Sequence, residues 1–168
     1  MLLVDVLGSL FAGRAAFEDT ARAIKDIAKG LSNQRIARLS IVATKADHVP
    51  ELSRASLREL LCVLAKDAAP AKRPTAVTFR TAASINSTQE GTSTQGDNVF
   101  AVVKGMVGGK MRPHYVGQVP SVWPPDHFWD HSLFKLPLFQ PRRYDPAKGQ
   151  IEHLGLDVVL NDIIGDLL

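Results

Sequence analysis

The stretch I-V-A-T-K-A-D-H-V-P occupies residues 41–50, and within it an apolar run gives way to a short polar segment. The run includes Leu39 and ends at Ala43, and Pro50 precedes residues whose apolar positions have helical spacing. A buried strand, a polar loop and a helix in this order are typical of α/β proteins. Because ligands bind at the carboxyl ends of the strands in open α/β sheets, we expect the loop to belong to a binding site.

The polar loop, Thr44-Lys45-Ala46-Asp47, resembles the base-specificity motif Asn/Thr-Lys-x-Asp of GTPases. The Asp47 carboxylate can accept two hydrogen bonds from guanine, one from the ring N–H and one from the exocyclic amine. Adenine has a lone pair where guanine has the ring N–H, so the same carboxylate disfavours adenine. The stem of Lys45 can lie flat over a base. A solvated loop with a helix-capping Asp47 is the alternative that so short a pattern leaves open.

A second pattern lies near the start of the chain, where the apolar residues 1–4 predict a strand that runs into Asp5-Val6-Leu7-Gly8. The spacing D-x-x-G resembles the GTPase motif in which the Asp holds Mg²⁺ through water and the Gly N–H faces the γ-phosphate. Gly suits that position because a residue without a Cβ lets the backbone approach a phosphate closely. Asp5 and Gly8 therefore become candidates for these two roles, with an ordinary strand-end Asp and turn Gly as the alternative.

A third pattern follows residues 75–82, whose side chains alternate as expected for a strand. The strand ends in Ala83-Ser84-Ile85, which resembles the last GTPase motif, where a backbone N–H from a turn of small residues contacts the guanine oxygen. Helical spacing predicts a helix over residues 16–31 and another from Pro50 to near Ala68. The three strand ends occur in the GTPase order, and the helices between them suit parallel crossovers. We predict an α/β fold with a mostly parallel sheet and flanking helices.

The second half of the chain is less regular. Residues 87–98 are polar and rich in Gly and Thr, which indicates a loop, and two β-prone segments, residues 99–103 and 110–118, flank glycines and predict a β-hairpin. Pro and aromatic residues dominate residues 120–146, which we expect to pack irregularly over the core. Residues 155–168 predict an apolar, substantially buried helix.

The predicted organisation is a GTPase-domain-like α/β portion in residues 1–98, a hairpin and Pro/Trp-rich insertion packed on it in residues 99–150, and a closing helix in residues 151–168. Lys and Arg are scattered at a net charge of +3, which argues against nucleic-acid binding. Cys62 is the single cysteine, and no apolar run reaches transmembrane length, so we expect a soluble, cytoplasmic protein.

Taken together, L-V-D-V-L-G, A-T-K-A-D-H-V-P, A-S-I-N-S-T-Q-E-G and P-x-F-x-P-R-R-x-D-P make the chain similar to the carboxyl-terminal portion of the YcjX-like family of P-loop NTPases. The resemblance implies a GTPase-type fold, GTP or GDP bound with Mg²⁺, and nucleoside-triphosphate hydrolysis in the full-length protein. It also implies a stress-associated cytoplasmic protein, peripheral to the inner membrane through a membrane-associated protein partner.

One departure from the family pattern matters for mechanism: no G-x-x-x-x-G-K-S/T sequence occurs in the chain. That loop supplies the N–H cradle and the Lys for the β- and γ-phosphates, so we expect the chain to be inactive alone, and no catalytic residue can be assigned. The loop would lie upstream of Met1, which suggests a truncated sequence and an incomplete P-loop NTPase-like sheet. A missing strand beside residues 1–4 would leave an unpaired sheet edge, which predicts self-association.

These observations give one main hypothesis and two alternatives. In the first, a guanine nucleotide is bound by Thr44, Lys45 and Asp47, by the backbone of Ala83, Ser84 and Ile85, and by Gly8, with Asp5 serving Mg²⁺; Thr44 in place of Asn loosens the motif and leaves ATP open. In the second, the chain is a nucleotide-independent protein-interaction module whose Trp/Pro-rich segment is the contact surface. The third is a metal-dependent hydrolase built on His127 and His131.

Overall fold

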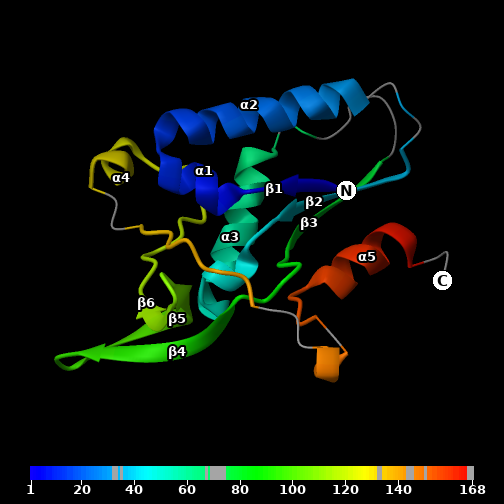
Figure 1. The fold of residues 1–168 in the computed structure, drawn as a ribbon. Coiled ribbons are helices and arrows are strands. Elements are labelled where there is room, and N and C mark those ends of the chain that lie inside the picture. The colour runs from blue at the N-terminus through cyan, green and yellow to red at the C-terminus, as the bar shows by residue number, and fades with distance from the viewer. Residues whose placement is uncertain are drawn as a thin grey trace.

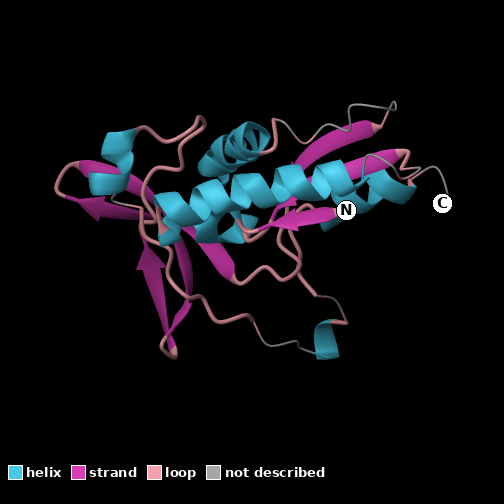
Figure 2. Cartoon of the chain, turned by 90° about the horizontal axis from the view of Figure 1, so that it is seen from above, coloured by secondary structure: helices cyan, strands magenta, loops and turns pink. Residues whose placement is uncertain are grey.

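A computed structural model of the chain describes residues 1–31, 34, 36–66, 68, 75–131, 134–142, 146–149 and 151–165. Two three-stranded sheets organise the described residues (Figure 1). The parallel sheet has the order β1 (Leu2–Val4), β2 (Arg38–Ala43) and β3 (Ala76–Thr81), and the antiparallel sheet has the order β4 (Thr88–Gln95), β5 (Asn98–Val107) and β6 (Lys110–His114). Both Figure 1 and Figure 2 place the antiparallel strands at one end of the molecule, away from β1.

The parallel sheet is covered on both faces. Alternate residues of β2 point to opposite sides, as in any strand. Ile41 belongs to the main core with helices α1 (Val6–Ala12), α2 (Arg14–Leu31) and α3 (Glu51–Leu64), whereas Val42 packs with Ala82 and Val159 of α5 (Leu156–Ile164). The apolar run of β2 is thus explained by burial on both faces, which is typical of parallel strands.

The strands β1, β2 and β3 confirm the predicted α/β class and the parallel pairing. β2 is the central strand, with Leu2 opposite Ile41 on one side and Arg38 opposite Ala76 on the other. In the described part of the chain β1 pairs with β2 alone, so its outer edge is open. Self-association through that edge stays a prediction.

The helix predicted from Pro50 to near Ala68 is confirmed as α3, which ends four residues earlier, at Leu64. Leu57, Leu60, Leu61 and Leu64 are buried, whereas Leu52 is 86 % exposed. Leu52 lies in the first turn of the helix.

The prediction of a loop over residues 87–98 was wrong, because residues Thr88–Gln95 form β4 and pair in register with β5 from Thr88 opposite Gly105 to Gln95 opposite Asn98. The hairpin of β5 and β6 is confirmed, and it is the second half of this larger sheet. The predicted domain boundary after residue 98 falls one residue into β5 and stays a prediction.

A helix that the sequence analysis did not predict, α1, begins directly after Asp5. Its buried side chains, Val6, Leu7 and Leu10, join the main core. Gly8, which was assigned to a phosphate-sensing loop, therefore lies in the first turn of a helix.

The Trp/Pro-rich segment packs over the core as predicted, although residues Asp126–His131 form a short helix, α4. The ring of Phe17 in α2 lies 5.1 Å from that of Trp123 and 5.5 Å from that of Trp129, measured between centroids. Helix α5 is less buried than predicted, because Val159 is enclosed but Val158 and Leu160 are exposed. Among the described residues, no helix combines the length and apolarity needed to cross a membrane.

Candidate functional site

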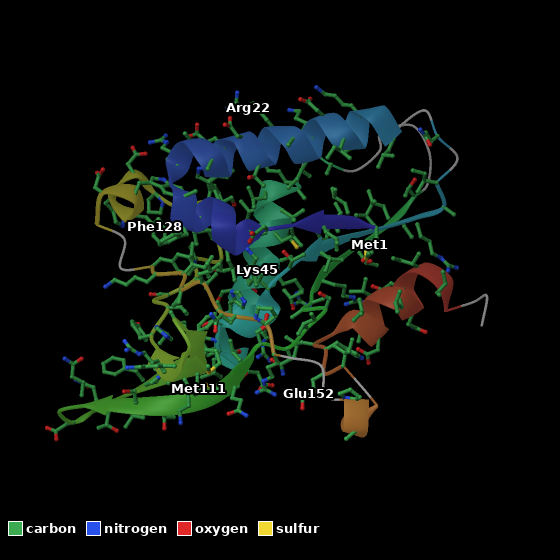
Figure 3. The ribbon with its side chains drawn as sticks, viewed as in Figure 1. Met1, Arg22, Lys45, Met111, Phe128 and Glu152 are labelled. Atoms are coloured by element: carbon green, nitrogen blue, oxygen red, sulfur yellow. The ribbon has the colours of Figure 1, made fainter. Side chains whose placement is uncertain are left out.

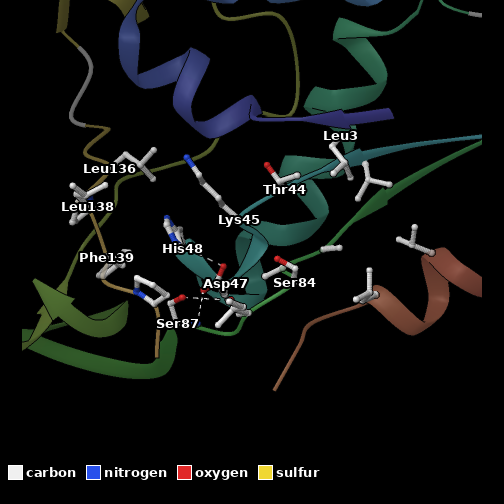
Figure 4. A pocket seen from close by; sticks show the side chains of 18 of the residues that line it. Leu3, Thr44, Lys45, Asp47, His48, Ser84, Ser87, Leu136, Leu138 and Phe139 are labelled. Atoms are coloured by element: carbon white, nitrogen blue, oxygen red, sulfur yellow. Dashed lines mark hydrogen bonds and ion pairs between the residues drawn. The ribbon is translucent and has the colours of Figure 1, made fainter. Parts of the chain in front are cut away.

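The carboxyl ends of β2 and β3 open into a cavity of about 710 Å³ (Figure 4). Its lining brings together residues from four parts of the chain. They are Val42, Thr44, Lys45, Asp47 and His48 at the end of β2; Ala82, Ala83, Ser84, Ile85 and Ser87 after β3; Met1, Leu3 and Phe11 from β1 and α1; and, from the last third of the chain, residues 136–139 and Pro141 together with Leu156 and Val159 of α5. Six of the seven residues predicted to bind the nucleotide therefore line one cavity, and Gly8 is the exception.

Asp47 is the buried charge of this cavity, with 3 % of its side chain exposed. Its Oδ2 accepts a hydrogen bond of 2.8 Å from the Ser87 N–H, and Oδ1 lies 3.9 Å from Nε2 of His48. The backbone carbonyl of Asp47 also accepts a bond from the Thr88 hydroxyl. A carboxylate has about four lone-pair sites, so the group is oriented by Ser87 with acceptor capacity left over.

Lys45 has an unusual backbone, with φ at 59° in the left-handed region. Its Nζ lies 2.5 Å from Oδ2 of Asp5, so the side chain extends from the end of β2 to the end of β1. Figure 3 shows Lys45 beside the junction of β1 and α1, with Met1 at the far end of β1. The ion pair fixes the direction of the Lys45 stem along the cavity wall.

Asp5 has two partners and is the N-cap of α1. Its Oδ1 accepts a hydrogen bond of 2.9 Å from the Gly8 N–H, and Lys45 occupies Oδ2. A Cβ at Gly8 would stand 2.6 Å from Oδ2 of Asp5, so the absence of a side chain at Gly8 permits this cap. The N–H that was predicted to face a γ-phosphate thus donates to Asp5.

Asp5, the residue predicted to serve Mg²⁺, has no cluster of further metal-ligating side chains around it among the described residues, and its role stays a prediction. Both carboxylate oxygens are engaged, and no group of three or more His, Cys, Asp or Glu side chains within the described ranges is placed to hold a metal ion. The side chain of His131, named in the hydrolase alternative, lies outside the described residues, so the pair with His127 stays a prediction.

Two other predicted residues make bonds to the backbone. Thr44 donates its N–H to Val4 O at 2.9 Å and its hydroxyl to the same oxygen at 3.3 Å, which ties β2 to β1. Ala83 exchanges two bonds of 2.9 Å with Leu154. The Ala83 N–H therefore already has an acceptor. Ser84 and Ile85 are the turn residues whose N–H groups remain candidates for donating to a ligand.

Sequence reasoning gave no role to Ser87 or to residues 136–141, which we call the strap. The sequence A-S-I-N-S-T contains Ser87, but its use as the donor to Asp47 depends on a contact across 40 positions. On the strap, the ring of Phe139 lies between His48 and His114, at centroid distances of 4.9 Å and 5.4 Å.

Burial also shifts the pKa values of His48 and His114. It lowers the pKa of His48 below its ordinary value of 6.5, although the Asp47 carboxylate acts in the opposite direction. It also lowers the pKa of His114, and the nearby Arg112 acts in the same direction. Both rings therefore favour the neutral form beside the strap.

Comparison with known proteins adds three findings. The profile of a family described as "YcjX-like family, DUF463" matches residues 1–168. The chain is 30 % identical over 183 residues to the Ras-like GTPase YcjX of Escherichia coli (strain K12), and 28 % identical over 185 residues to the protein of the same name from Shewanella oneidensis. Each alignment covers 100 % of this chain but 39 % or 38 % of the relative, so the chain spans about two fifths of the length of these curated proteins.

Proposed function

The chain belongs to the YcjX-like family, and from this premise we propose that it supplies the base-binding part of a GTPase-type, P-loop NTPase-like nucleotide site. The name of the relatives, Ras-like GTPase, supports a guanine nucleotide. The observation that carries the proposal is the buried Asp47 carboxylate, oriented by Ser87 at the wall of a mostly apolar cavity.

Burying a carboxylate is costly unless it is hydrogen-bonded, and Asp47 has one short bond from the protein to compensate it. A planar ligand that offers two N–H donors side by side would complete its hydrogen bonding. Guanine has such a pair, whereas adenine would place a lone pair against the carboxylate. In this proposal the N–H groups of Ser84 and Ile85 serve the guanine oxygen, and the stem of Lys45 covers one face of the base.

Phosphate binding and hydrolysis are a separate part of the proposal. The chain contains no G-x-x-x-x-G-K-S/T sequence, and the Gly8 N–H is directed at Asp5. We therefore assign hydrolysis of GTP and the use of Mg²⁺ to a protein that also has a phosphate-binding loop. For these 168 residues, the proposal predicts that the base provides nearly all of the binding free energy.

The test is a titration of the 168-residue chain with guanosine, GDP and adenosine, with and without Mg²⁺. NMR chemical shifts of the protein measure the binding. We expect guanosine to bind with a Kd on the order of 0.1–1 mM. GDP should bind within about threefold of guanosine with or without Mg²⁺, and adenosine should bind at least about tenfold more weakly, a difference of ~1.4 kcal/mol. Equal binding of guanosine and adenosine, or no binding of either, would overturn the proposal.

A variant of Asp47 sharpens the test. Asp47→Asn keeps an oxygen for the Ser87 N–H and replaces the other with an amide donor. Xanthine has a ring N–H donor beside a carbonyl acceptor, so the variant should lose its preference for guanosine and gain one for xanthosine. Circular dichroism of the variant serves as the control that the fold is intact.

The interaction-module alternative retains one supporting observation. Met1, Leu3 and Phe11 are each more than half exposed at the cavity mouth, and clustered exposed apolar side chains are typical of protein contact surfaces. In the Trp-rich segment, Trp129 packs on Phe17, and Trp123 also contacts Phe17 but is 39 % exposed. Asp47→Asn separates the alternatives, because it should change nucleoside preference without changing partner binding.

A further inference from the structure

We propose that Leu138 on the strap forms the second wall of the base site, so that a purine is held between this leucine and the stem of Lys45. The inference rests on the proposed function, because it assumes that the cavity takes a nucleoside. Figure 4 shows Leu136, Leu138 and Phe139 together on one side of the view and Lys45 and Asp47 nearer its centre, and all five residues line the cavity.

The strap is fixed near both ends, to β5 at one end and to the segment that follows β6 at the other. The Lys135 N–H donates to Val116 O at 3.0 Å, and the Gln140 N–H donates to Met106 O at 2.8 Å. Between them the Phe139 ring is buried against His48 and His114. A segment anchored in this way has a fixed backbone path without a ligand.

Leu138 is next to the buried Phe139 and is 88 % exposed. A single exposed leucine is ordinary in itself. Here, however, the leucine lines a cavity whose wall is mostly apolar, and its neighbour fixes the backbone from which it extends. A purine face placed against Leu138 would remove the side chain from water, and burial of apolar surface is the main source of such binding.

The wall and the carboxylate should have different effects on specificity. Asp47 distinguishes bases by their hydrogen-bonding groups, whereas an apolar contact with the flat face is nearly the same for every purine. Removal of Leu138 should therefore weaken the binding of all purine nucleosides while leaving the ratio of guanosine to adenosine affinity unchanged.

The experiment compares Leu138→Ala with Leu52→Ala in guanosine and adenosine titrations of the 168-residue chain. Leu52 is a matched control, because it is 86 % exposed, on α3, and does not line the cavity. We expect Leu138→Ala to weaken guanosine binding about tenfold and Leu52→Ala to change it less than about twofold. Leu138→Met should restore most of the affinity, and guanosine should shift the Leu138 methyl signals of the wild type.

The outcomes separate this inference from the proposed function. If the wild type binds guanosine and Leu138→Ala binds it equally well, the wall is wrong and the base site stands. An equal loss in Leu52→Ala, or a changed guanosine-to-adenosine ratio in Leu138→Ala, would also overturn the wall. If the wild type binds no purine nucleoside, both the wall and the proposed function fail.

Discussion

Gly105 of β5 lies against the ring of Phe139, so closely that a Cβ atom at Gly105 would stand 2.4 Å from the ring Cδ1. The ring also lies between His48 and His114, which limits the directions in which it could move. This contact links the antiparallel sheet to the cavity, because Phe139 holds the strap that lines it. A glycine in the middle of a strand is here explained by the close approach of another segment.

Gly105→Ala should therefore destabilise the chain. The added methyl group cannot be accommodated without moving Phe139, and overpacking of this kind costs about 1–3 kcal/mol. Urea unfolding at equilibrium measures the loss as a lower midpoint at constant slope.

Gly91→Ala is the matched control, because a Cβ there would meet Lys104 Cε at 2.6 Å, near the end of a flexible side chain. The lysine can move aside, so we expect a change within about 0.5 kcal/mol. Equal destabilisation by the two substitutions would show that loss of glycine in the sheet, and not the contact with Phe139, is responsible.

Asp5 gives a prediction that separates its charge from its role as a helix cap. Asp5→Ala removes the acceptor for the Gly8 N–H and should cost about 0.5–2 kcal/mol. Asp5→Asn preserves that acceptor but removes the charge that faces Lys45, and because the ion pair is half-exposed this should cost less than about 1 kcal/mol. Thermal unfolding of both variants measures the difference.

The informative result is which of the two substitutions destabilises the fold more. If Asp5→Asn were as destabilising as Asp5→Ala, the ion pair with Lys45 would outweigh the cap. If neither substitution changed the melting temperature, the N-cap assignment of Asp5 would be wrong.

The sequence predicted the parallel sheet and the place of the cavity because both depend on local signals. The apolar run of β2 and the polar residues after Ala43 are enough to locate a buried strand end. Because ligands bind at such strand ends, the sequence alone predicts that Asp47 and Ser84 belong to the same site.

The features that the sequence did not predict are of two kinds. One is a motif that fits two different local structures, and the other is a strand that depends on contacts between residues far apart in the sequence. D-x-x-G at residues 5–8 fits a phosphate motif, but it also fits a helix cap, and in the structure Asp5 caps α1. Strand β4 has the polar sequence T-Q-E-G-T-S-T-Q, without the apolar alternation of a half-buried strand. It forms because β5 pairs with it and because Glu90 accepts bonds from Arg54 and from the N-terminus of α3. No local pattern encodes either contact.

The last prediction concerns pH and the histidines beside Phe139. Burial lowers the pKa of both His48 and His114, so the unfolded chain binds protons more readily than the folded chain as the pH falls below about 6.5. The folded state therefore loses stability from about pH 6.5 downward, at no more than about 1.4 kcal/mol per pH unit for each histidine. Asp162, whose pKa is lowered by hydrogen bonds from Arg80, contributes its own loss only at lower pH, below the usual aspartate range near 3.8.

Urea midpoints at pH 7, 6 and 5 should thus decrease in the wild type, and His114→Gln should flatten the decrease because it removes one of the two titrating rings. His114 is the better choice for this substitution, since His48 lies next to Asp47 in the cavity and its replacement would change the base site as well. NMR titration of the two ring signals gives an independent measurement. A titration midpoint above pH 6.5 for either histidine ring would mean that the fold stabilises its charged form. The stability of the fold would then rise, not fall, as the pH is lowered through that midpoint.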